Sequence, residues 1–164
     1  MHREKNRNRK RVCEMLTLEK FEEASEIVKK VTQETQLIYS DYFSSHTGNK
    51  VYLKPENRQV TGAYKIRGAY YKISTLTPGE REKGLITASA GNHAQGVALG
   101  AKKNNIKAVI CLPDGAPISK VEATRSYGAE ICLVEGVYDD AYNKALQLRD
   151  EMGYTFIHPF NDPD

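Results

Sequence analysis

The sequence is poor in cysteine and has no long apolar run, and these two shortages exclude several classes of protein. No stretch of the 164 residues approaches the ~20 consecutive apolar residues of a membrane-spanning helix, so we expect no membrane partner. An apolar signal region is also missing at the N-terminus, which argues against secretion. The three cysteines, Cys13, Cys111 and Cys132, form no CxxC pair. We therefore expect free, mostly buried thiols and a cytoplasmic protein.

Beyond the first eleven residues, positive and negative charges nearly balance. The net charge is +3, but the opening MHREKNRNRKR carries six Lys or Arg and one Glu. Subtracting this balance of +5 leaves residues 12–164 at −2. The opening contains no aromatic residue that could stack on bases, and no basic face follows it, so we expect no nucleic-acid partner. Its composition predicts a disordered tail over residues 1–14, with Met15 as an alternative start of translation.

From Gly84 onward, strand-like and helix-like segments alternate. The apolar runs typical of buried strands are LITAS, KAVICLP, EICLVEG and YTFIHPF. Helical patterns separate them, at about Asn92–Lys103, Ser119–Tyr127 and Tyr138–Met152. Strands that alternate with helices indicate βαβ units. We therefore predict an α/β fold, an open, parallel, twisted sheet with helices on both faces.

The pattern before Gly84 is less regular. Residues 18–31 are amphipathic and have Thr17 as a candidate N-cap. QLIYSDYF is interpreted as a short extended piece, and KVYLKPE as a strand that ends at Pro55. TPGEREKG predicts a turn into a short helix.

The stretch TGAYKIRGAYYK places a lysine where a helix disfavours one. The apolar residues recur with helical spacing, at Ile66, Ala69, Tyr70 and Ile73. Thr61 or Gly62 could cap the helix, which puts Lys65 in the first turn, where the helix dipole makes a cation mildly unfavourable. One explanation is that Lys65 extends into water and has no role. The other is that the protein uses its amine chemically.

A second informative stretch is TASAGNHAQG, which reads as a strand end, a short polar loop and a helix start. Ligands of open α/β sheets bind at the carboxyl ends of strands, and free N–H groups at a helix N-terminus attract anions. Ser89 offers a hydroxyl, Asn92 an amide, and Gly91 allows close approach of the backbone. The alternative is an ordinary turn in which Ser and Asn serve as caps.

Several motifs of other enzyme classes are absent. The sequence has no GxGxxG, no GxxxxGK[ST] and no HExxH, which argues against dinucleotide, P-loop and zinc sites. His46, His93 and His158 have no partners at metal-ligand spacing. We expect no metal and interpret all three as structural histidines, with His93 also shaping the loop. Gly96 and Gly100, four residues apart, predict a helix packed closely on the sheet.

An amine at a helix start and a carboxylate-binding loop together suit a Schiff base with an aldehyde cofactor and an amino-acid substrate. At this point the sequence resembles a known family. LKPENRQVTGAYKIRGAYYK followed by ITASAGNHAQGVALGAKK is similar to the threonine ammonia-lyases, which use pyridoxal phosphate and have the tryptophan-synthase-β-like fold. The resemblance covers roughly residues 18–164.

The resemblance implies a role for each site residue. Lys65 would be the catalytic lysine that forms the Schiff base with pyridoxal 5′-phosphate, and Tyr64 an aromatic beside the cofactor ring. Asn92 would bond the 3′-oxygen of the pyridine. The loop that receives the substrate carboxylate would consist of Ser89, Ala90, Gly91, Asn92 and His93.

The sequence departs from the family pattern in two places. Ala63 stands where many members have serine, so a hydroxyl is missing there. The glycine-rich loop that the family uses for the cofactor phosphate does not occur. We therefore expect the N-terminal part of a longer, homo-oligomeric enzyme. Its expected divisions are a tail (1–14), the start of a large domain (15–53), a small α/β domain (54–158) and a return to the large domain (159–164).

The implied activity is deamination of L-threonine to 2-oxobutanoate and ammonia, and of L-serine to pyruvate. The alternatives are a serine racemase or serine dehydratase of the same fold, or a non-catalytic remnant. The sequence does not separate a dehydratase from a racemase.

Overall fold

The structure, a computed structural model, describes residues 16–162. Its centre is a four-stranded parallel sheet of β3 (Leu85–Ala88), β4 (Ala108–Pro113), β5 (Glu130–Val134) and β6 (Thr155–Phe156). The strand order is β5-β4-β3-β6, so β6, the last strand of the sheet in the sequence, lies beside β3, the first. The predicted open parallel α/β fold is confirmed. The tail predicted for residues 1–14, and Cys13 within it, lie outside the described residues.

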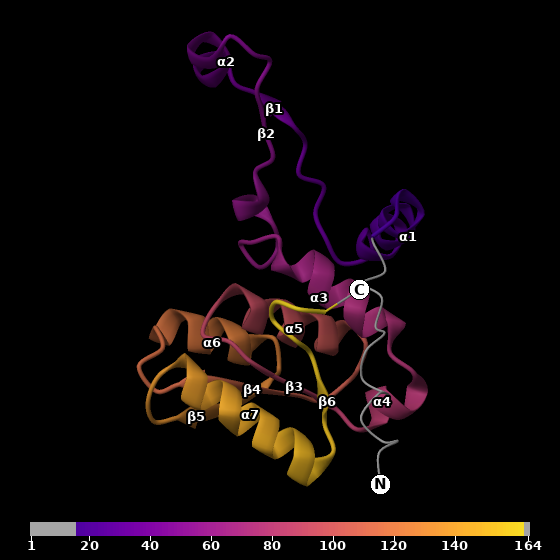
Figure 1. Cartoon of the computed structure of the whole chain (residues 1–164), viewed down its shortest axis with the longest axis vertical. Helices are drawn as coiled ribbons and strands as arrows, with labels where there is room; N and C mark the ends of the chain where they lie inside the picture. The colour runs from indigo at the N-terminus through magenta and orange to yellow at the C-terminus, as the bar shows by residue number, and fades with distance from the viewer. Residues whose placement is uncertain (1–15, 163–164) are drawn as a thin grey trace, which may run out of the picture.

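Helices cover both faces of this sheet (Figure 1). On one face lie α5 (Asn92–Lys103) and α6 (Ile118–Ser126), and on the other lies α7 (Tyr138–Met152). Strand side chains alternate between the two layers. Leu85, Ile110 and Leu112 pack in the cluster that contains residues of α5 and α6, whereas Ile86 and Val109 pack with the alanines of α7. Each face therefore has its own apolar core.

A third layer consists of α3 (Lys65–Thr75), which packs on α5. Gly96 and Gly100 make this contact possible, because they bring α5 against α3. A Cβ on Gly96 would lie 3.2 Å from the carbonyl carbon and oxygen of Lys65, and one on Gly100 would lie 2.8 Å from Cδ1 of Ile73. The prediction that these glycines pack on the sheet was wrong, since α3 fills that side of α5.

The N-terminal residues form a helix and a projecting arm. Helix α1 (Leu18–Val28) is capped by Thr17, as predicted, and packs on α3. The arm consists of a two-stranded antiparallel pair and a helix at its tip, and it extends away from the sheet (Figure 1). Its elements are β1 (Ile38–Tyr39), α2 (Asp41–Thr47) and β2 (Tyr52–Leu53).

Several predicted boundaries differ from the observed ones. QLIYSDYF is extended only at its start, because the Ser40 side chain accepts a hydrogen bond from Phe43 N and starts α2. The cap of α3 is Tyr64, not Thr61 or Gly62. YTFIHPF contributes two strand residues, after which the chain leaves the sheet.

The remaining elements agree with the sequence. The predicted turn and short helix correspond to α4 (Pro78–Glu82), and a 3₁₀ turn covers Glu56–Arg58. Of the two described cysteines, Cys111 is buried and Cys132 half-buried, and both are free thiols. Within residues 16–162 no helix combines the length and apolar character that crossing a bilayer requires.

Candidate active site

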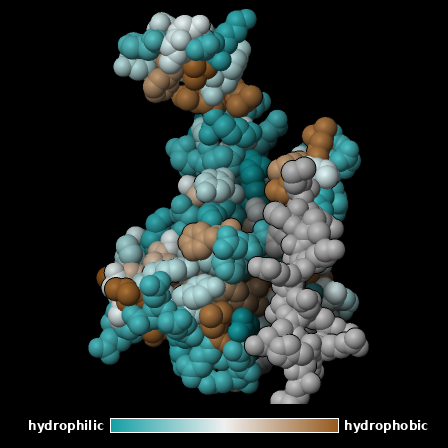
Figure 2. Space-filling model, viewed as in Figure 1, coloured by the Kyte–Doolittle hydropathy of each residue, from teal (hydrophilic) through white to brown (hydrophobic). Residues whose placement is uncertain are grey.

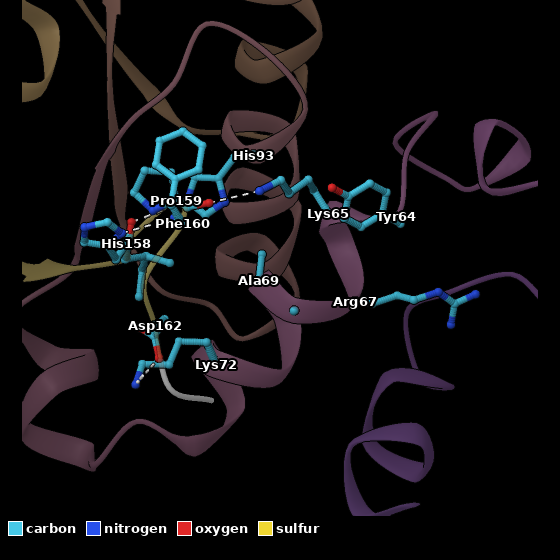
Figure 3. A pocket seen from close by; sticks show the side chains of 12 residues that line it. Tyr64, Lys65, Arg67, Ala69, Lys72, His93, His158, Pro159, Phe160 and Asp162 are labelled. Carbon is cyan, nitrogen blue, oxygen red and sulfur yellow. Dashed lines mark hydrogen bonds and ion pairs between the residues drawn. The ribbon is translucent and has the colours of Figure 1, made fainter. Parts of the chain in front are cut away.

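A cleft of about 250 Å³ lies between the first half of α3 and the segment that follows β6. It has Lys65 at its rim and is shown in Figure 3. The residues that line it are Tyr64, Lys65, Arg67, Gly68, Ala69, Lys72, His93, Ile157, His158, Pro159, Phe160 and Asp162. Complete ligand pockets usually have volumes of ~300–1,000 Å³, so this cleft has the size of part of a site.

The amine of Lys65 lies in the cleft between two aromatic rings. Its Nζ is 6.0 Å from the ring centroid of Tyr64 and 5.4 Å from that of Phe160. Both rings are largely exposed. The same Nζ donates a hydrogen bond of 2.9 Å to the Pro159 carbonyl. Lysine at the first position of α3 is therefore held in place rather than extended freely into water.

His93 closes one side of the cleft from the first turn of α5. Its ring is buried, and its Nε2 donates a long, 3.4 Å hydrogen bond to the Ile157 carbonyl. Burial lowers the pKa of His93 to about 4, and the nearby charge of Lys65 acts in the same direction. The ring is thus uncharged at neutral pH and does not repel a cation on Lys65.

The segment after β6 forms the other wall. Thr87 Oγ1 on β3 donates to the Ile157 carbonyl at 2.7 Å. The His158 ring stands between Tyr142 of α7 and the backbone that carries Phe160. Asp162 forms an ion pair of 3.0 Å with Lys72 of α3. These contacts fix the segment at both ends, directly over Lys65 (Figure 3).

Most of the predicted carboxylate loop does not line this cleft. Of its residues only His93 is a lining residue, while Ser89, Ala90, Gly91 and Asn92 are not. Ser89 Oγ accepts a hydrogen bond from the Gly91 N–H at 3.2 Å. Asn92 is exposed, and its Oδ1 accepts a 3.4 Å hydrogen bond from Lys120. The structure thus brings Lys65, Tyr64 and His93 together and leaves the rest of the loop beside them.

Sequence reasoning missed Phe160, Pro159 and Asp162 as site residues, and it assigned His158 no function. A signal was available. In a parallel sheet the carboxyl ends of all strands lie at one edge, and HPF is the carboxyl end of the fourth predicted strand, YTFIHPF. What the sequence did not show is that β6 pairs with β3, through Ile86 and Phe156, and so brings HPF to the Lys65 side.

A polar network connects the arm to α3 on the far side of the cleft. Arg67 points away from Lys65 (Figure 3) and forms a two-pronged ion pair with Glu56, with N–O distances of 2.8 and 2.9 Å. Thr35 donates a further hydrogen bond to the same carboxylate. The hydrogen bond from Arg67 lowers the pKa of Glu56 to about 2. This network fixes the orientation of the arm where it joins α3.

Residues 16–162 contain no group of three or more His, Cys, Asp or Glu side chains arranged to hold a metal ion. The chemistry of the cleft is that of a primary amine between aromatic rings, with a neutral imidazole beside it. A half-buried amine of this kind is suited to attack an aldehyde.

Comparison with known proteins agrees with this chemistry. An L-threonine ammonia-lyase from Thermotoga maritima is 50% identical over 149 residues, which are 91% of this chain and 37% of the relative. A catabolic L-threonine dehydratase from Staphylococcus aureus is 45% identical, over 90% of this chain and 43% of its own length. The chain thus spans about two fifths of the length of the curated relatives it matches.

Solved structures of threonine deaminase and serine racemase are also similar to this chain. Threonine deaminase isoform 2 from Solanum lycopersicum superposes with a TM-score of 0.80 at 36% identity, over 90% of this chain and 45% of that one. Maize serine racemase has a TM-score of 0.80 at 35% identity, over 86% and 43% of the two chains. The model of the family described as pyridoxal-phosphate dependent enzyme matches residues 28–164. The chain belongs to the pyridoxal-phosphate dependent enzyme family.

Proposed function

We propose that this chain supplies the amine and the amino-acid-binding side of a cytoplasmic L-threonine ammonia-lyase. In this reaction L-threonine gives 2-oxobutanoate and ammonia, and L-serine gives pyruvate. The observation that carries the proposal is the Lys65 amine, held at the rim of a cleft between the rings of Tyr64 and Phe160. The similarity to threonine ammonia-lyases and threonine deaminases supports it.

The residues present fit pyridoxal phosphate. Lys65 provides the amine for its aldehyde, and the exposed ring of Tyr64 provides an apolar surface for its planar ring. Gly68 lines the cleft, and a Cβ at this position would meet nothing within 4 Å, so that side is open. When bound, the cofactor would act as an electron sink for charge that develops at the substrate Cα. Asn92 would hold the ring oxygen.

The chain's own residues would then move the proton and orient the substrate. The Lys65 amine lines the cleft, and once the substrate amine has taken its place on the aldehyde it would be free to remove the Cα proton. His93 stays neutral because of its burial and would separate Lys65 from the sheet without adding charge. The N–H groups at the start of α5, with Ser89, would receive the substrate carboxylate. The β-hydroxyl would leave as water together with a proton, and a second water would hydrolyse the resulting enamine to 2-oxobutanoate and ammonia.

The proposal includes a division of the chain into parts. Residues 54–158 would form the small domain, and residues 15–53 together with 159–164 would belong with a large domain. The projecting arm and the partial size of the cleft support this division. In the whole enzyme we expect a homo-oligomer, since the arm exposes apolar residues.

The test is the covalent attachment of pyridoxal phosphate. The chain is incubated with a large excess of the cofactor, so that even weak binding populates the Schiff base, then reduced with borohydride and digested. The modified lysine is identified by mass spectrometry. We expect the label on Lys65 and none after Lys65→Ala, whereas Lys103→Ala, at an exposed site on α5, should be labelled normally. Lys65→Arg should not restore labelling, because a guanidinium is not a usable nucleophile here. Equal labelling of Lys65→Ala on another lysine would contradict the proposal.

A second candidate is serine racemization, which the likeness to maize serine racemase favours. Product analysis separates the two. With the part of the Thermotoga maritima relative that this chain does not span supplied as a second polypeptide, a dehydratase converts L-threonine to 2-oxobutanoate and L-serine to pyruvate. A racemase instead accumulates D-serine. Absence of both products and of any cofactor binding would identify a non-catalytic protein.

A further inference from the structure

His158, which the sequence predicts to be a structural histidine, binds backbone N–H groups through its ring. Its Nδ1 accepts two backbone hydrogen bonds, from the N–H of Phe160 at 3.1 Å and from the N–H of Asn161 at 2.9 Å. A backbone N–H is always a donor, so Nδ1 carries no proton in this arrangement. A neutral ring must therefore carry its proton on Nε2.

The other ring nitrogen fits this assignment. Nε2 lies 3.2 Å from the Tyr142 hydroxyl of α7. With the proton on Nε2, the ring donates to the Tyr142 oxygen, and Tyr142 keeps its own proton for another acceptor. The ring also lies edge-on to Tyr142, Phe156 and Phe160, with centroid distances of 6.1, 5.9 and 6.5 Å. Packing and hydrogen bonding thus define a single orientation of His158.

The turn that His158 closes presents one group to the active site. Pro159 lies between His158 and the two N–H groups bound by its ring, and the Pro159 carbonyl accepts the hydrogen bond from Lys65 Nζ. Proline itself has no N–H to donate, so the turn depends on the side chain of His158. The aromatic ring of Phe160 beside Lys65 is carried by the same turn.

We propose that His158 is a positioning residue for Lys65. Its ring, unprotonated at Nδ1, holds the turn of residues 158–161 so that the Pro159 carbonyl and the Phe160 ring confine the Lys65 amine. This inference deepens the proposed function, on which it rests for the meaning of Lys65.

The far end of the segment is held separately, because Asp162 forms an ion pair with Lys72 of α3. A substitution of His158 should therefore affect the turn of residues 158–161 and leave the contact at Asp162 in place.

The experiment compares two substitutions of His158 on the complete chain. Asparagine places its Oδ1 where Nδ1 of histidine lies and forms such turns with its own backbone, but does not titrate. Glutamine extends toward Tyr142 and leaves the two N–H groups without their acceptor. The readout is acetylation of Lys65 by acetic anhydride, relative to the exposed Lys103, measured by mass spectrometry without cofactor. His46→Gln on the arm is the matched control.

In His158→Asn and His46→Gln we expect Lys65 to be acetylated to the same extent, relative to Lys103, as in the unmodified chain. His158→Gln should raise the labelling ratio roughly threefold to tenfold, the factor that a lost hydrogen bond of about 0.7–1.4 kcal/mol gives.

Long-range ¹H–¹⁵N spectra of the unmodified chain test the tautomer without any substitution, so the proposal remains testable if a variant fails to fold. A proton on Nδ1 of folded, neutral His158 would overturn it, as would equal labelling in His158→Gln and His158→Asn. Failure of the proposed function looks different. In that case pyridoxal phosphate does not attach to Lys65, although the tautomer and the acetylation pattern are as expected.

Discussion

At the scale of single residues, burial and hydrogen bonding change the acidity of two groups that matter for the site. His93 is buried beside Lys65, and its pKa is lowered to about 4. Glu56 is held by Arg67 at the base of the arm, and its pKa is lowered to about 2. Both shifts link the stability of the fold to pH.

The first prediction is a fall in stability in two successive windows as pH decreases. His93 has a folded pKa below its ordinary 6.5, so the unfolded chain binds the proton first. The free energy of unfolding should therefore decrease between about pH 6.5 and pH 4, by roughly 1–3 kcal/mol. The contribution of Glu56 is complete above its ordinary 4.5 and is lost as pH falls toward 2.

Urea denaturation between pH 7 and pH 4.5 isolates the first window. His93→Gln should flatten the dependence on pH there, while His46→Gln on the exposed arm should leave it unchanged. An unchanged slope in His93→Gln would show that burial of this ring does not govern the acid sensitivity. Glu56→Gln should flatten the dependence only below about pH 4.5.

At the scale of elements, the contact of α3 with α5 sets the position of Lys65. A Cβ added at Gly96 would lie 3.2 Å from the carbonyl group of Lys65, and backbone atoms have little freedom to move aside. Gly68, in α3 itself, faces open space. The two glycines therefore respond in opposite directions to the same substitution.

We predict that Gly96→Ala destabilises the fold and Gly68→Ala stabilises it. An added methyl group at Gly96 forces the helices apart, at a cost of about 1–3 kcal/mol that exceeds the gain in helix propensity. At Gly68 only the gain remains, about 0.4–1 kcal/mol. Thermal unfolding of both variants measures this. A stabilised Gly96→Ala would mean that the helices are not in close contact at Lys65.

Regular elements with strong local signals could be predicted from the sequence. Helices α5 and α7 have the predicted bounds, because their apolar spacing and flanking residues define both ends. Other features depend on distant partners. The turn after β6 exists because β6 pairs with β3 and because His158 binds the backbone ahead of it. Helix α2 was missed because its Ser40 cap follows a run of strand-like residues.

The candidate site likewise contains residues with a local signal in the sequence and residues that only distant contacts bring to it. Lys65 was identified from an electrostatic conflict within one helix, and the structure places Tyr64 and His93 beside it. Phe160 and Pro159 come from residues about 95 positions later, and no local pattern connects them to Lys65. The functions of all the predicted site residues stay predictions, for Lys65, Tyr64 and His93 as well as for Ser89, Ala90, Gly91 and Asn92.

At the scale of the whole molecule, the arm is the least covered part. Figure 2 shows hydrophobic residues among hydrophilic ones at the tip of the arm, and Leu37, Tyr42 and Tyr52 are each more than half exposed. Exposed apolar side chains that lie together favour association. Its attachment through Arg67 and Glu56 holds it in a defined direction.

We predict that the 164-residue chain associates with itself through the arm. Sedimentation should show a molecular weight that rises with protein concentration, and Tyr42→Ser together with Tyr52→Ser should reduce the rise. Lys102→Ser and Lys103→Ser at the exposed end of α5 are the control. Concentration-independent monomers would exclude the arm as an association surface under those conditions.

We also predict that the chain alone binds pyridoxal phosphate weakly and does not dehydrate threonine. A phosphate dianion usually relies on several charge-assisted hydrogen bonds, each contributing about 1.5–3 kcal/mol, and this sequence lacks the glycine-rich loop of the family. Absorbance titration with the cofactor and an assay for 2-oxobutanoate measure both. Tight binding and turnover by the chain alone would show that other residues hold the phosphate.

The strand order also fixes when the cleft can form as the chain is made. Strands β3, β4 and β5 are complete once residue 134 has been synthesised, and Lys65 is present much earlier. The bond between Thr87 and Ile157 spans 70 residues, and that between Lys65 and Pro159 spans 94. The entropy of closing such loops grows slowly with length, by only about 0.6 kcal/mol per doubling. Until residue 159 has been synthesised, the Lys65 amine therefore lacks its hydrogen-bond partner and is not covered by this segment.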